Sequence, residues 1–460
     1  MEVRSIRLVC FRPIRNPIKL PRVYRFLFLG FVFLLARLST LEAQGQSPNP
    51  ELQAYRFAEG WRLNGLSGST LRLSGFVQPS LTSTLQVGDT IEAWTHRYRM
   101  RRIRLRLDGK AADPRFGYRL QADLSGTGEE LDGNSNYLLD AYVTWEPSAR
   151  WNITLGQRAP YTDNRELWMQ SYALHLVERS RLTSVFASIR EFGLFIDGTL
   201  RLKGGVYLKP YFCLTNGDGL NQRGPDRGGL KWGGRFDLLP FGLFTAMGQF
   251  HQPDLVRERT PKFVLGAAYS YNQGISDRRG RESGAILYLD PNGQSLLPDF
   301  AKVGFDFLFK YQGFSLLGEW MKSGASIPTA ITQRVRTDGS IAQDFPIEGL
   351  NNMDAYLRNR MMLGSALNLQ GGYLFKKGFS IDGRYTHLQG DRYSFMNNAT
   401  FYNRPRYYTL GFTAYSGRHY GARWQCDLTW VDNDGGIANN QGILVQAKEW
   451  IIRTMVTFAF

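Results

Sequence analysis

Apolar and polar residues alternate along most of the chain, from about residue 69 to the C-terminus. Arginine and aliphatic residues alternate strictly over residues 102–107, and the same period of two recurs in residues 116–124, 302–311, 379–385 and 420–430. A period of two places successive side chains on opposite faces of a β-strand. The pattern therefore predicts many strands, each with one apolar and one polar face.

Two architectures use strands of this kind. A soluble sandwich turns its apolar faces toward a second sheet, whereas an outer-membrane barrel turns them toward lipid and its polar faces toward a lumen. Three features favour the barrel: charges lie in mid-strand, connections alternate between short and long, and aromatic residues such as Trp145, Trp151, Trp320 and Trp430 lie near segment ends. Aromatic girdles of this kind mark the two membrane interfaces of barrels.

The connections help to set the number of strands. Short turns are expected at 147–150, 312–313, 376–378 and 416–418, and long loops at 159–190, 216–229, 272–298, 323–365 and 390–404. A first count gives 17 strand-like segments, and bacterial barrels have even numbers. The count becomes 16 if residues 231–250 form one long strand, and 18 if residues 285–289 add one. We predict an all-β fold, a transmembrane antiparallel β-barrel with 16 strands favoured over 18 and with long external loops.

The N-terminus reads as an export signal. Seven basic residues precede an apolar run from Phe26 to Ala36, which is too short to cross a bilayer, and Ala43 is the expected cleavage residue. We expect residues 1–43 to be a signal peptide, residues 44–68 a polar linker and residues 69–460 the barrel. Removal of the signal peptide would lower the formal charge from +16 to +10.

The last strand carries a second targeting signal. The apolar residues Trp450, Ile452, Val456, Phe458 and Phe460 share one strand face, and the chain ends on an aromatic. Such a strand resembles the signal that outer-membrane insertion machinery reads, with Phe460 as its contact. We therefore expect a multi-pass barrel in the Gram-negative cell outer membrane, surrounded by outer-membrane lipid.

The arginine run is the most informative chemistry. Turning Arg102, Arg104 and Arg106 toward lipid would cost about 2–4 kcal/mol each near the bilayer midplane, so these side chains should face the lumen. Guanidinium stays charged and presents a planar fork of donors that suits phosphate, and rings of basic side chains select anions. The same parity places further arginines inside, and we expect them to line the pore: Arg119, Arg158, Arg235, Arg384 and Arg423.

Two points stay open from the residues alone. The inward charges either guide anions or are ordinary lumen charges neutralised by inward carboxylates, which are found in porins of every selectivity. The connection 159–190 lies where a third external loop should be, and it either folds inward to narrow the channel or forms an external lid.

At this point the sequence resembles the phosphate-selective porin O and P family of Gram-negative outer membranes. The resemblance rests on the order and spacing of several short groups: 141–147, 155–160, 178–179, 190–193, 216–217 and 304–319. It implies a 16-stranded barrel that assembles as a homotrimer and passes small anions such as phosphate. It also implies lumen arginines, for which the run at 102–106 is the counterpart, and a constriction aspartate, for which Asp123 and Asp140 are candidates.

Other functions find little support. The chain lacks the G-x-S-x-G and H-E-x-x-H motifs, and its five histidines are scattered without metal-ligand spacing. We expect no enzyme activity, no cofactor or metal and no nucleic-acid partner. The leading hypothesis is a water-filled porin for passive diffusion of anions. The alternative is a non-conducting outer-membrane barrel that serves adhesion or a larger envelope complex.

Overall fold

The computed structural model describes most of the chain after the predicted signal peptide. The described residues are 52–56, 59–65, 67–87, 94–125, 137–188, 190–217, 219–220, 228–275, 287–336, 338–397, 404–417, 419–432, 437–438, 444–445 and 448–460. The predicted signal peptide and its cleavage residue lie outside them. In this part of the chain, the search for a membrane-spanning helix finds no candidate.

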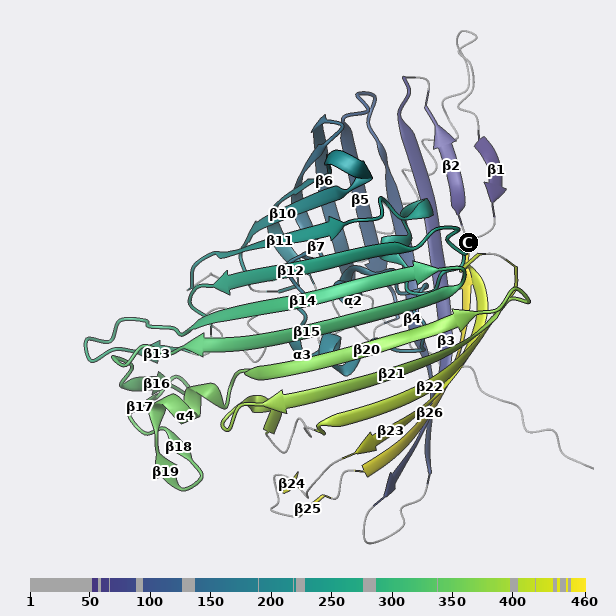
Figure 1. Ribbon diagram of the computed structural model, residues 1–460. Coiled ribbons are helices and arrows are strands. Elements are labelled where there is room, and N and C mark those ends of the chain that lie inside the picture. Colours follow the sequence, from purple (N-terminus) through teal and green to yellow (C-terminus); the bar gives the residue numbers. More distant parts are fainter. Residues whose placement is uncertain are drawn as a thin grey trace, which may run out of the picture. The chain divides into compact units, whose positions relative to one another are not determined.

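A closed antiparallel barrel of 16 strands forms the main body, as predicted (Figure 1). Its strands, in chain order, are β3 (Thr70–Val87), β4 (Thr95–Lys110), β5 (Phe116–Asp123), β6 (Leu138–Ser148), β7 (Trp151–Arg158), β8 (Glu191–Gly198), β10 (Tyr207–Thr215), β11 (Lys231–Leu239), β12 (Lys262–Asn272), β14 (Asp299–Tyr311), β15 (Phe314–Ser326), β20 (Gly364–Leu374), β21 (Phe379–Gly390), β22 (Arg406–Tyr415), β23 (Ala422–Asp432) and β26 (Lys448–Ala459). Each pairs with its neighbours, and β26 closes the ring by pairing with β3 from Lys448↔Val87 to Ala459↔Phe76.

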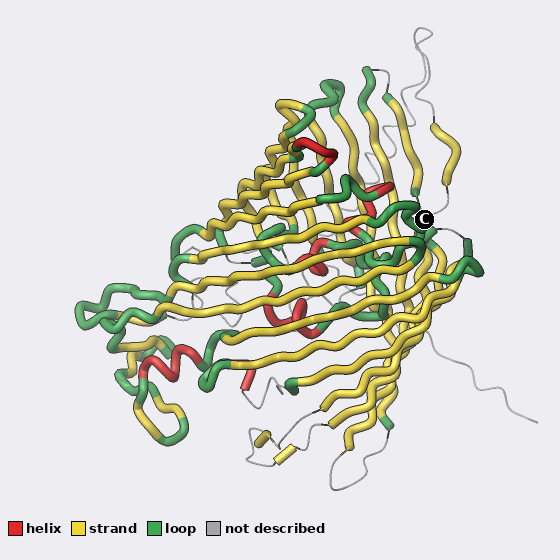
Figure 2. Tube along the Cα trace, viewed as in Figure 1, coloured by secondary structure: helices red, strands yellow, loops and turns green. Residues whose placement is uncertain are grey.

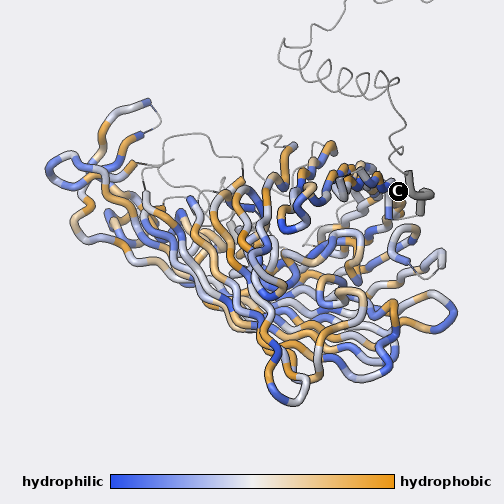
Figure 3. The backbone as a smooth tube through the Cα atoms, turned by 90° about the horizontal axis from the view of Figure 1, so that it is seen from above, coloured by the Kyte–Doolittle hydropathy of each residue, from blue (hydrophilic) through white to orange (hydrophobic). Residues whose placement is uncertain are grey.

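The two faces of the barrel wall differ as the alternation requires. Apolar and polar residues alternate along the strands (Figure 3). Outward apolar side chains are exposed, such as Leu410 at 63% and Phe236 at 60%, while inward polar neighbours such as Thr409 and Asp237 are buried. Exposure of so much apolar surface is stable when lipid covers it. The inside-out distribution therefore supports a membrane barrel and excludes a sandwich.

Residues 52–64 form a hairpin where we expected a polar linker. Strands β1 (Leu52–Arg56) and β2 (Gly60–Asn64) pair with each other, and β2 pairs with the first residues of β3, from Trp61↔Leu73 to Asn64↔Thr70. The expected linker at 44–68 thus contains two strands within its described residues. Trp61 and Leu63 place two apolar side chains on one face of β2. Strand β2 thereby pairs with the first residues of β3, which lie beyond the end of the pairing with β26.

The predicted count of 16 is correct, but its basis is not. Residues 231–250 do not form one long strand, because β11 ends at Leu239 and is followed by Pro240, which cannot donate to a strand ladder. A 3₁₀ segment, η2 (Thr245–Phe250), follows. The segment near 285–289 adds only β13 (Tyr288–Leu289), which pairs with β16 (Gln333–Val335) outside the barrel.

The remaining elements lie in the connections. They are α2 (Arg165–Trp168), α3 (Arg181–Phe186), β9 (Leu200–Arg201), η1 (Lys203–Gly205), β17 (Ile341–Ala342), β18 (Pro346–Ile347), β19 (Leu350–Asn351), α4 (Met353–Arg358), η3 (Phe395–Asn397), β24 (Ile437–Ala438) and β25 (Leu444–Val445). The group β13, β16–β19 and α4 lies together beyond the ends of β14 and β15 (Figures 1 and 2). It has its own apolar cluster, which includes Tyr288, Phe345 and Leu357.

The lipid-facing role of the outer wall predicts different costs at two equally exposed leucines. Leu410 lies in the middle of β22, and Leu350 lies in the hairpin β18–β19 outside the barrel; they are 63% and 65% exposed. Leu410→Arg should lower the free energy of unfolding by about 2–4 kcal/mol in a lipid bilayer. Leu350→Arg should change it by less than about 0.5 kcal/mol. Denaturant unfolding in phospholipid vesicles measures both, and equal effects would argue against lipid contact at Leu410.

Candidate functional site

The arginine-rich strand β4 changes the direction of its alternation at Arg101. Along the ladder with β3, Gln78 is opposite Arg102 and Pro79 is opposite Met100, so Arg101 is an extra, unpaired residue. Such a β-bulge shifts the side-chain alternation by one position. After the bulge along the chain, the even-numbered arginines face inward. Before the bulge, the odd-numbered residues do. Met100 and Tyr98 are accordingly on the exposed outer face.

The bulge brings more arginines into the interior than a single parity allows. Arg102 and Arg104 are buried at 1% and 4% exposure, as the inward prediction requires. Arg99 and Arg101 also reach the interior, where both contact the carboxylate of Glu178. The sequence analysis missed these two residues. The signal was present in the doubled Arg101–Arg102, across which the apolar positions change from even to odd numbers.

The long connection 159–190 lies inside the barrel, which confirms the inward alternative. Arg165 bonds Asp237 on β11 at 2.9 Å and Asp306 on β14 at 2.6 Å. The backbone nitrogen of Val177 donates to Asp427 on β23 at 2.9 Å. These contacts reach strands on different sides of the wall. The connection therefore crosses the lumen rather than covering its mouth.

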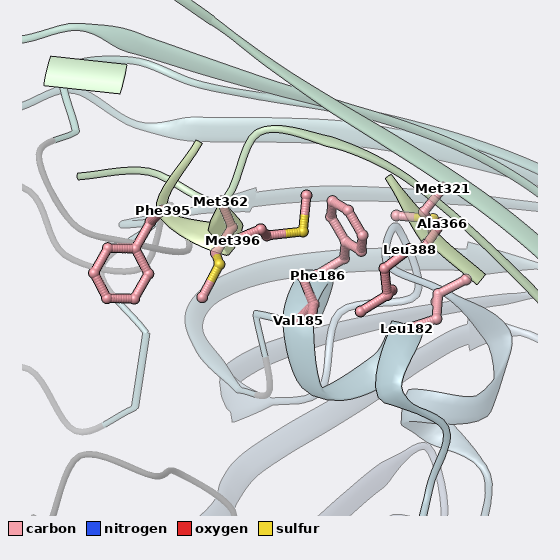
Figure 4. Close-up of a cluster of buried hydrophobic side chains, with 9 residues drawn as sticks. All are labelled: Leu182, Val185, Phe186, Met321, Met362, Ala366, Leu388, Phe395 and Met396. Atoms are coloured by element: carbon pink, nitrogen blue, oxygen red, sulfur yellow. The ribbon is translucent and has the colours of Figure 1, made fainter. Parts of the chain in front are cut away.

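Helix α3 fixes one part of this connection to the wall. Ser180 caps the helix by accepting a hydrogen bond from the backbone nitrogen of Thr183 at 3.2 Å. Leu182, Val185 and Phe186 form its apolar face. That face packs on β15, β20, β21 and η3, as Figure 4 shows, through a cluster completed by Met321, Met362, Ala366, Leu388, Phe395 and Met396. The polar residues of the helix are thereby held on the other side.

A second segment enters the barrel from the short-turn end. The connection 240–261, of which residues 240–250 were expected to belong to a strand, meets loop 159–190 through two backbone hydrogen bonds. Gln170 donates to Phe250 at 2.9 Å, and Gln252 donates to Ala173 at 2.9 Å. Lys310 on β14 donates to the carbonyl oxygens of Gly248 and Pro253. The two inward segments thus narrow the lumen together.

The cavity beside these segments is strongly basic. It has a volume of about 440 Å³, and eight arginines line it together with two carboxylates, Glu178 and Glu449. The arginines come from β4, from the loop, from the position two residues before β22, and from β21 and β26: Arg99, Arg101, Arg102, Arg179, Arg181, Arg404, Arg384 and Arg453. We call this space the arginine cavity. The lining therefore carries an excess of six positive charges.

Hydroxyl groups complete the polar lining of the arginine cavity. They belong to Thr82, Thr84, Thr183, Ser184, Thr386, Thr409 and Thr429. Many lining residues are near the long-loop ends of their strands, since Thr84 is close to the end of β3 and Glu449 is close to the start of β26. Long loops face the outside in outer-membrane barrels. The cavity therefore lies toward the external half of the lumen.

Glu178 holds the loop against the arginines of β4. Its carboxylate accepts from Arg101, from Arg102 at 3.2 Å and from Arg99 at 3.4 Å. Burial alone would raise the pKa of this carboxyl, but the positive charges of Arg101 and Arg102 hold its pKa well below the usual range. Glu178 is therefore negatively charged at any pH at which the barrel works.

Several arginines of the arginine cavity are held by neutral groups as well as by carboxylates, since Arg384 lies 3.9 Å from Glu166 and Arg453 pairs with Asp427 at 3.3 Å. Arg179 donates to the carbonyl oxygens of Leu167 and Met169 and to the hydroxyl of Ser171, and Arg384 donates to the carbonyl oxygen of Glu178 at 2.8 Å. Neutral acceptors fix the position of a guanidinium without cancelling its charge. The donors are therefore preorganised while the local excess of positive charge remains.

Two histidines in the inward segments are buried without charge. Burial, together with the positive charge of Lys310, lowers the pKa of both His175 and His251 to about 3. His175 contacts the hydroxyl of Ser315 at 2.7 Å, and His251 stacks on Tyr420. Both rings are therefore neutral packing groups near neutral pH and add nothing to the excess charge.

Only two of the eight arginines predicted to line the pore, Arg102 and Arg384, line the arginine cavity. Arg104 pairs with Asp123 at 3.1 Å, and Arg106 pairs with Asp108 at 2.8 Å. Arg235 bonds Asp237 and Asp306, and Arg423 donates to the carbonyl oxygen of Leu174 at 2.7 Å. For Arg104, Arg106 and Arg235, the arrangement matches the alternative of neutralised lumen charges.

The other two predicted arginines face aromatic rings. The guanidinium of Arg119 lies 5.6 Å from the ring centre of Tyr142, and that of Arg158 lies 4.4 Å from the ring centre of Tyr161. Both candidate constriction aspartates are in ion pairs: Asp123 with Arg104, and Asp140 with Arg190 at 3.1 Å. Whether any of these groups guides anions stays a prediction.

The described residues hold no cluster of metal-ligating side chains. Cys213 and Cys426 are both free thiols. The polar groups of the described interior include guanidinium, ammonium, carboxylate, amide and hydroxyl groups and the imidazoles of His175 and His251.

One family model matches part of the chain. Residues 85–195 match the model of a family described as phosphate-selective porin O and P. This stretch contains β4 and the whole of loop 159–190. A search of curated proteins finds no match.

Several solved porin structures are similar to the chain. The outer membrane channel DcaP of Acinetobacter baumannii has 11% identity and a TM-score of 0.47, with 86% of this chain and 99% of that chain covered. The anion-selective porin from Comamonas acidovorans has 11% identity and a TM-score of 0.48, with 85% and 100% covered. OmpT of Vibrio cholerae, in its trimer form, has 8% identity and a TM-score of 0.45, with 85% and 99% covered.

The family match and the inside-out barrel lead to one conclusion. The family expected from the sequence is matched over residues 85–195, and the chain forms a 16-stranded β-barrel of the outer membrane.

Proposed function

We propose that this porin passes small anions in preference to cations, and that the arginine cavity is the step that selects them. The observation that carries the proposal is the composition of the cavity lining, with eight arginines against two carboxylates. Basic side chains around a narrow lumen raise the local concentration of anions and repel cations. Cavity arginines also form ion pairs, such as Arg453 with Asp427, so the proposal rests on the local excess of arginine over carboxylate.

Phosphate is the anion that best fits the donors. A guanidinium presents two parallel N–H groups that match two phosphate oxygens, and the cavity adds threonine and serine hydroxyls. Arg102 and Arg384 are held by hydrogen bonds to Gln78 and to the carbonyl oxygen of Glu178. Donors that are already fixed lose little entropy when an anion arrives. Chloride would pass the same lumen with fewer hydrogen bonds.

Neutralising two cavity arginines should weaken anion preference. In the double variant Arg384→Gln/Arg453→Gln, two charges are removed while amide donors remain to satisfy nearby oxygens. The reversal potential in a salt gradient across a planar bilayer should move from anion preference toward zero, because the excess charge of the cavity falls by a third.

A matched control removes the same charge elsewhere. Arg106→Gln/Lys110→Gln changes two cations on β4 that pair with Asp108 and Glu146 outside the cavity, and it should leave the reversal potential nearly unchanged. Equal shifts in both double variants would assign selectivity to net charge rather than to the arginine cavity. A folded preparation that conducts no current would favour the alternative, a barrel for adhesion or for an envelope complex.

We further infer that three copies assemble, and that the wall formed by the short strands β5, β7 and β8 lies at the interface. Strands β5, β7 and β8 have eight residues each, whereas β14 and β15 have 13 each. A strand of eight residues, tilted by about 40°, rises only about 20 Å, which is less than the apolar band of about 25 Å. A neighbouring copy would cover the part of the bilayer that this wall leaves unmatched.

A charge on the outer face of the short strands should separate the copies. Leu155 on β7 is 54% exposed on the outer face, and Leu155→Arg would place an unpaired charge in the inferred interface. We expect native mass spectrometry in mild detergent to show trimer for the native protein and monomer for this variant. Leu410→Arg, on β22 and away from the short strands, should stay trimeric. A native protein that is monomeric in the same detergent would contradict the assembly.

The C-terminal strand supports the expected route into the membrane. Trp450, Ile452, Val456 and Phe458 are exposed on the outer face of β26, and the backbone of Phe460 pairs with Gly75 through two hydrogen bonds of 2.9 Å. We propose that insertion machinery reads this apolar face, with Phe460 at its end, before the strand closes the barrel against β3.

A further inference from the structure

The arginine cavity is larger than an inorganic anion requires. Its volume of about 440 Å³ compares with about 30 Å³ for one water molecule in the liquid. It falls within the range of about 300–1,000 Å³ in which proteins bind small organic ligands. A single phosphate would leave most of this space to water, so size alone permits a much larger anion.

The cavity lining has apolar as well as polar residues. Besides its charged and hydroxyl groups it includes Leu167, Ala187, Tyr407 and Ile451. Leu167 and Ala187 belong to one apolar cluster of the inward loop, and Tyr407 packs against the cluster that anchors α3. Apolar surface contributes nothing to the passage of chloride or inorganic phosphate, because these ions keep their hydration where no donor replaces it.

The inward position of two of these apolar residues runs against the pattern of the wall. Ile451 lies between the exposed Trp450 and Ile452 on β26, and Tyr407 precedes the exposed Tyr408 on β22. Their inward neighbours two positions along the strands, Arg453 and Thr409, are polar, and apolar inward residues return only further along, at Met455 and Tyr415. Apolar side chains at polar-face positions are the feature expected where a ligand with an apolar body is bound.

We propose that the arginine cavity is a binding site for organic anions that join a doubly charged head to an apolar or aromatic body. The head would bind the arginines, and the body would rest on Tyr407 and Ile451. Aryl phosphates are the simplest members of this class. The inference rests on the proposed function, since it assigns a preferred substrate class to the same cavity.

Block of single-channel chloride current provides the test, with phenyl phosphate and inorganic phosphate as the two probes. Phenyl phosphate should block at a concentration about tenfold lower than inorganic phosphate. That ratio corresponds to about 1.4 kcal/mol. Equal half-blocking concentrations would overturn the inference while leaving anion selectivity intact.

Variants of the apolar lining separate the head from the body of the ligand. Tyr407→Ala should remove most of the preference for phenyl phosphate and leave block by inorganic phosphate within twofold of the native value. Tyr408→Ala is the matched control, because Tyr408 is the next residue on β22 and is exposed on the outer face. The same loss of preference in both variants, or in neither, would overturn the inference.

A second variant keeps the test independent of the packing around Tyr407. Ile451→Thr preserves the shape of a β-branched side chain in a strand but places a hydroxyl where the apolar body would lie, so it should also reduce the preference for phenyl phosphate. The double variant Arg384→Gln/Arg453→Gln should weaken block by both probes. If neither probe blocks and the reversal potential shows no anion preference, the proposed function itself fails, which is a different result from equal block.

Discussion

The high cost of placing a guanidinium in hydrocarbon organises this molecule. Strand β4 carries arginines at 97, 99, 101, 102, 104 and 106, and a strand with one strict alternation would turn part of them toward lipid. The bulge at Arg101 avoids that cost by changing which residues face inward. The interior then holds many positive charges close together, and other parts of the barrel supply carboxylates that pair with them.

The inward loop supplies the matching layer of charge. Glu178 meets the arginines of β4, Asp163 meets Lys302, and Arg165 carries a positive charge to Asp237 and Asp306 on the opposite wall. Carboxylates match several of the positive charges where the loop crosses the lumen, whereas arginines outnumber carboxylates eight to two in the lining of the arginine cavity. Under the proposed function, selectivity depends on where this local excess of arginine lies, and the number of lumen arginines alone does not determine it.

The sequence predicts the barrel well, because alternation is a local property imposed by lipid on one side and water on the other. It also predicts the inward direction of Arg102, but it leaves loop 159–190 open between an inward fold and an external lid. It does not separate Arg102 from Arg104, because pairing with Asp123 or Glu178 depends on strands and loops brought together by closure of the ring. It misses the inward segment 240–261, since nothing local to Pro240 shows that the following residues turn into the lumen.

The account depends most directly on the change of alternation at Arg101. Spin labels placed singly at Tyr98, Arg99, Met100, Ile103 and Arg104 in the reconstituted protein would report contact with lipid or with water. The account predicts oxygen accessibility, the mark of lipid, at Tyr98, Met100 and Ile103, and water-soluble relaxant accessibility at Arg99 and Arg104. A single alternation through all five positions, with Arg99 and Ile103 on the same side, would contradict it.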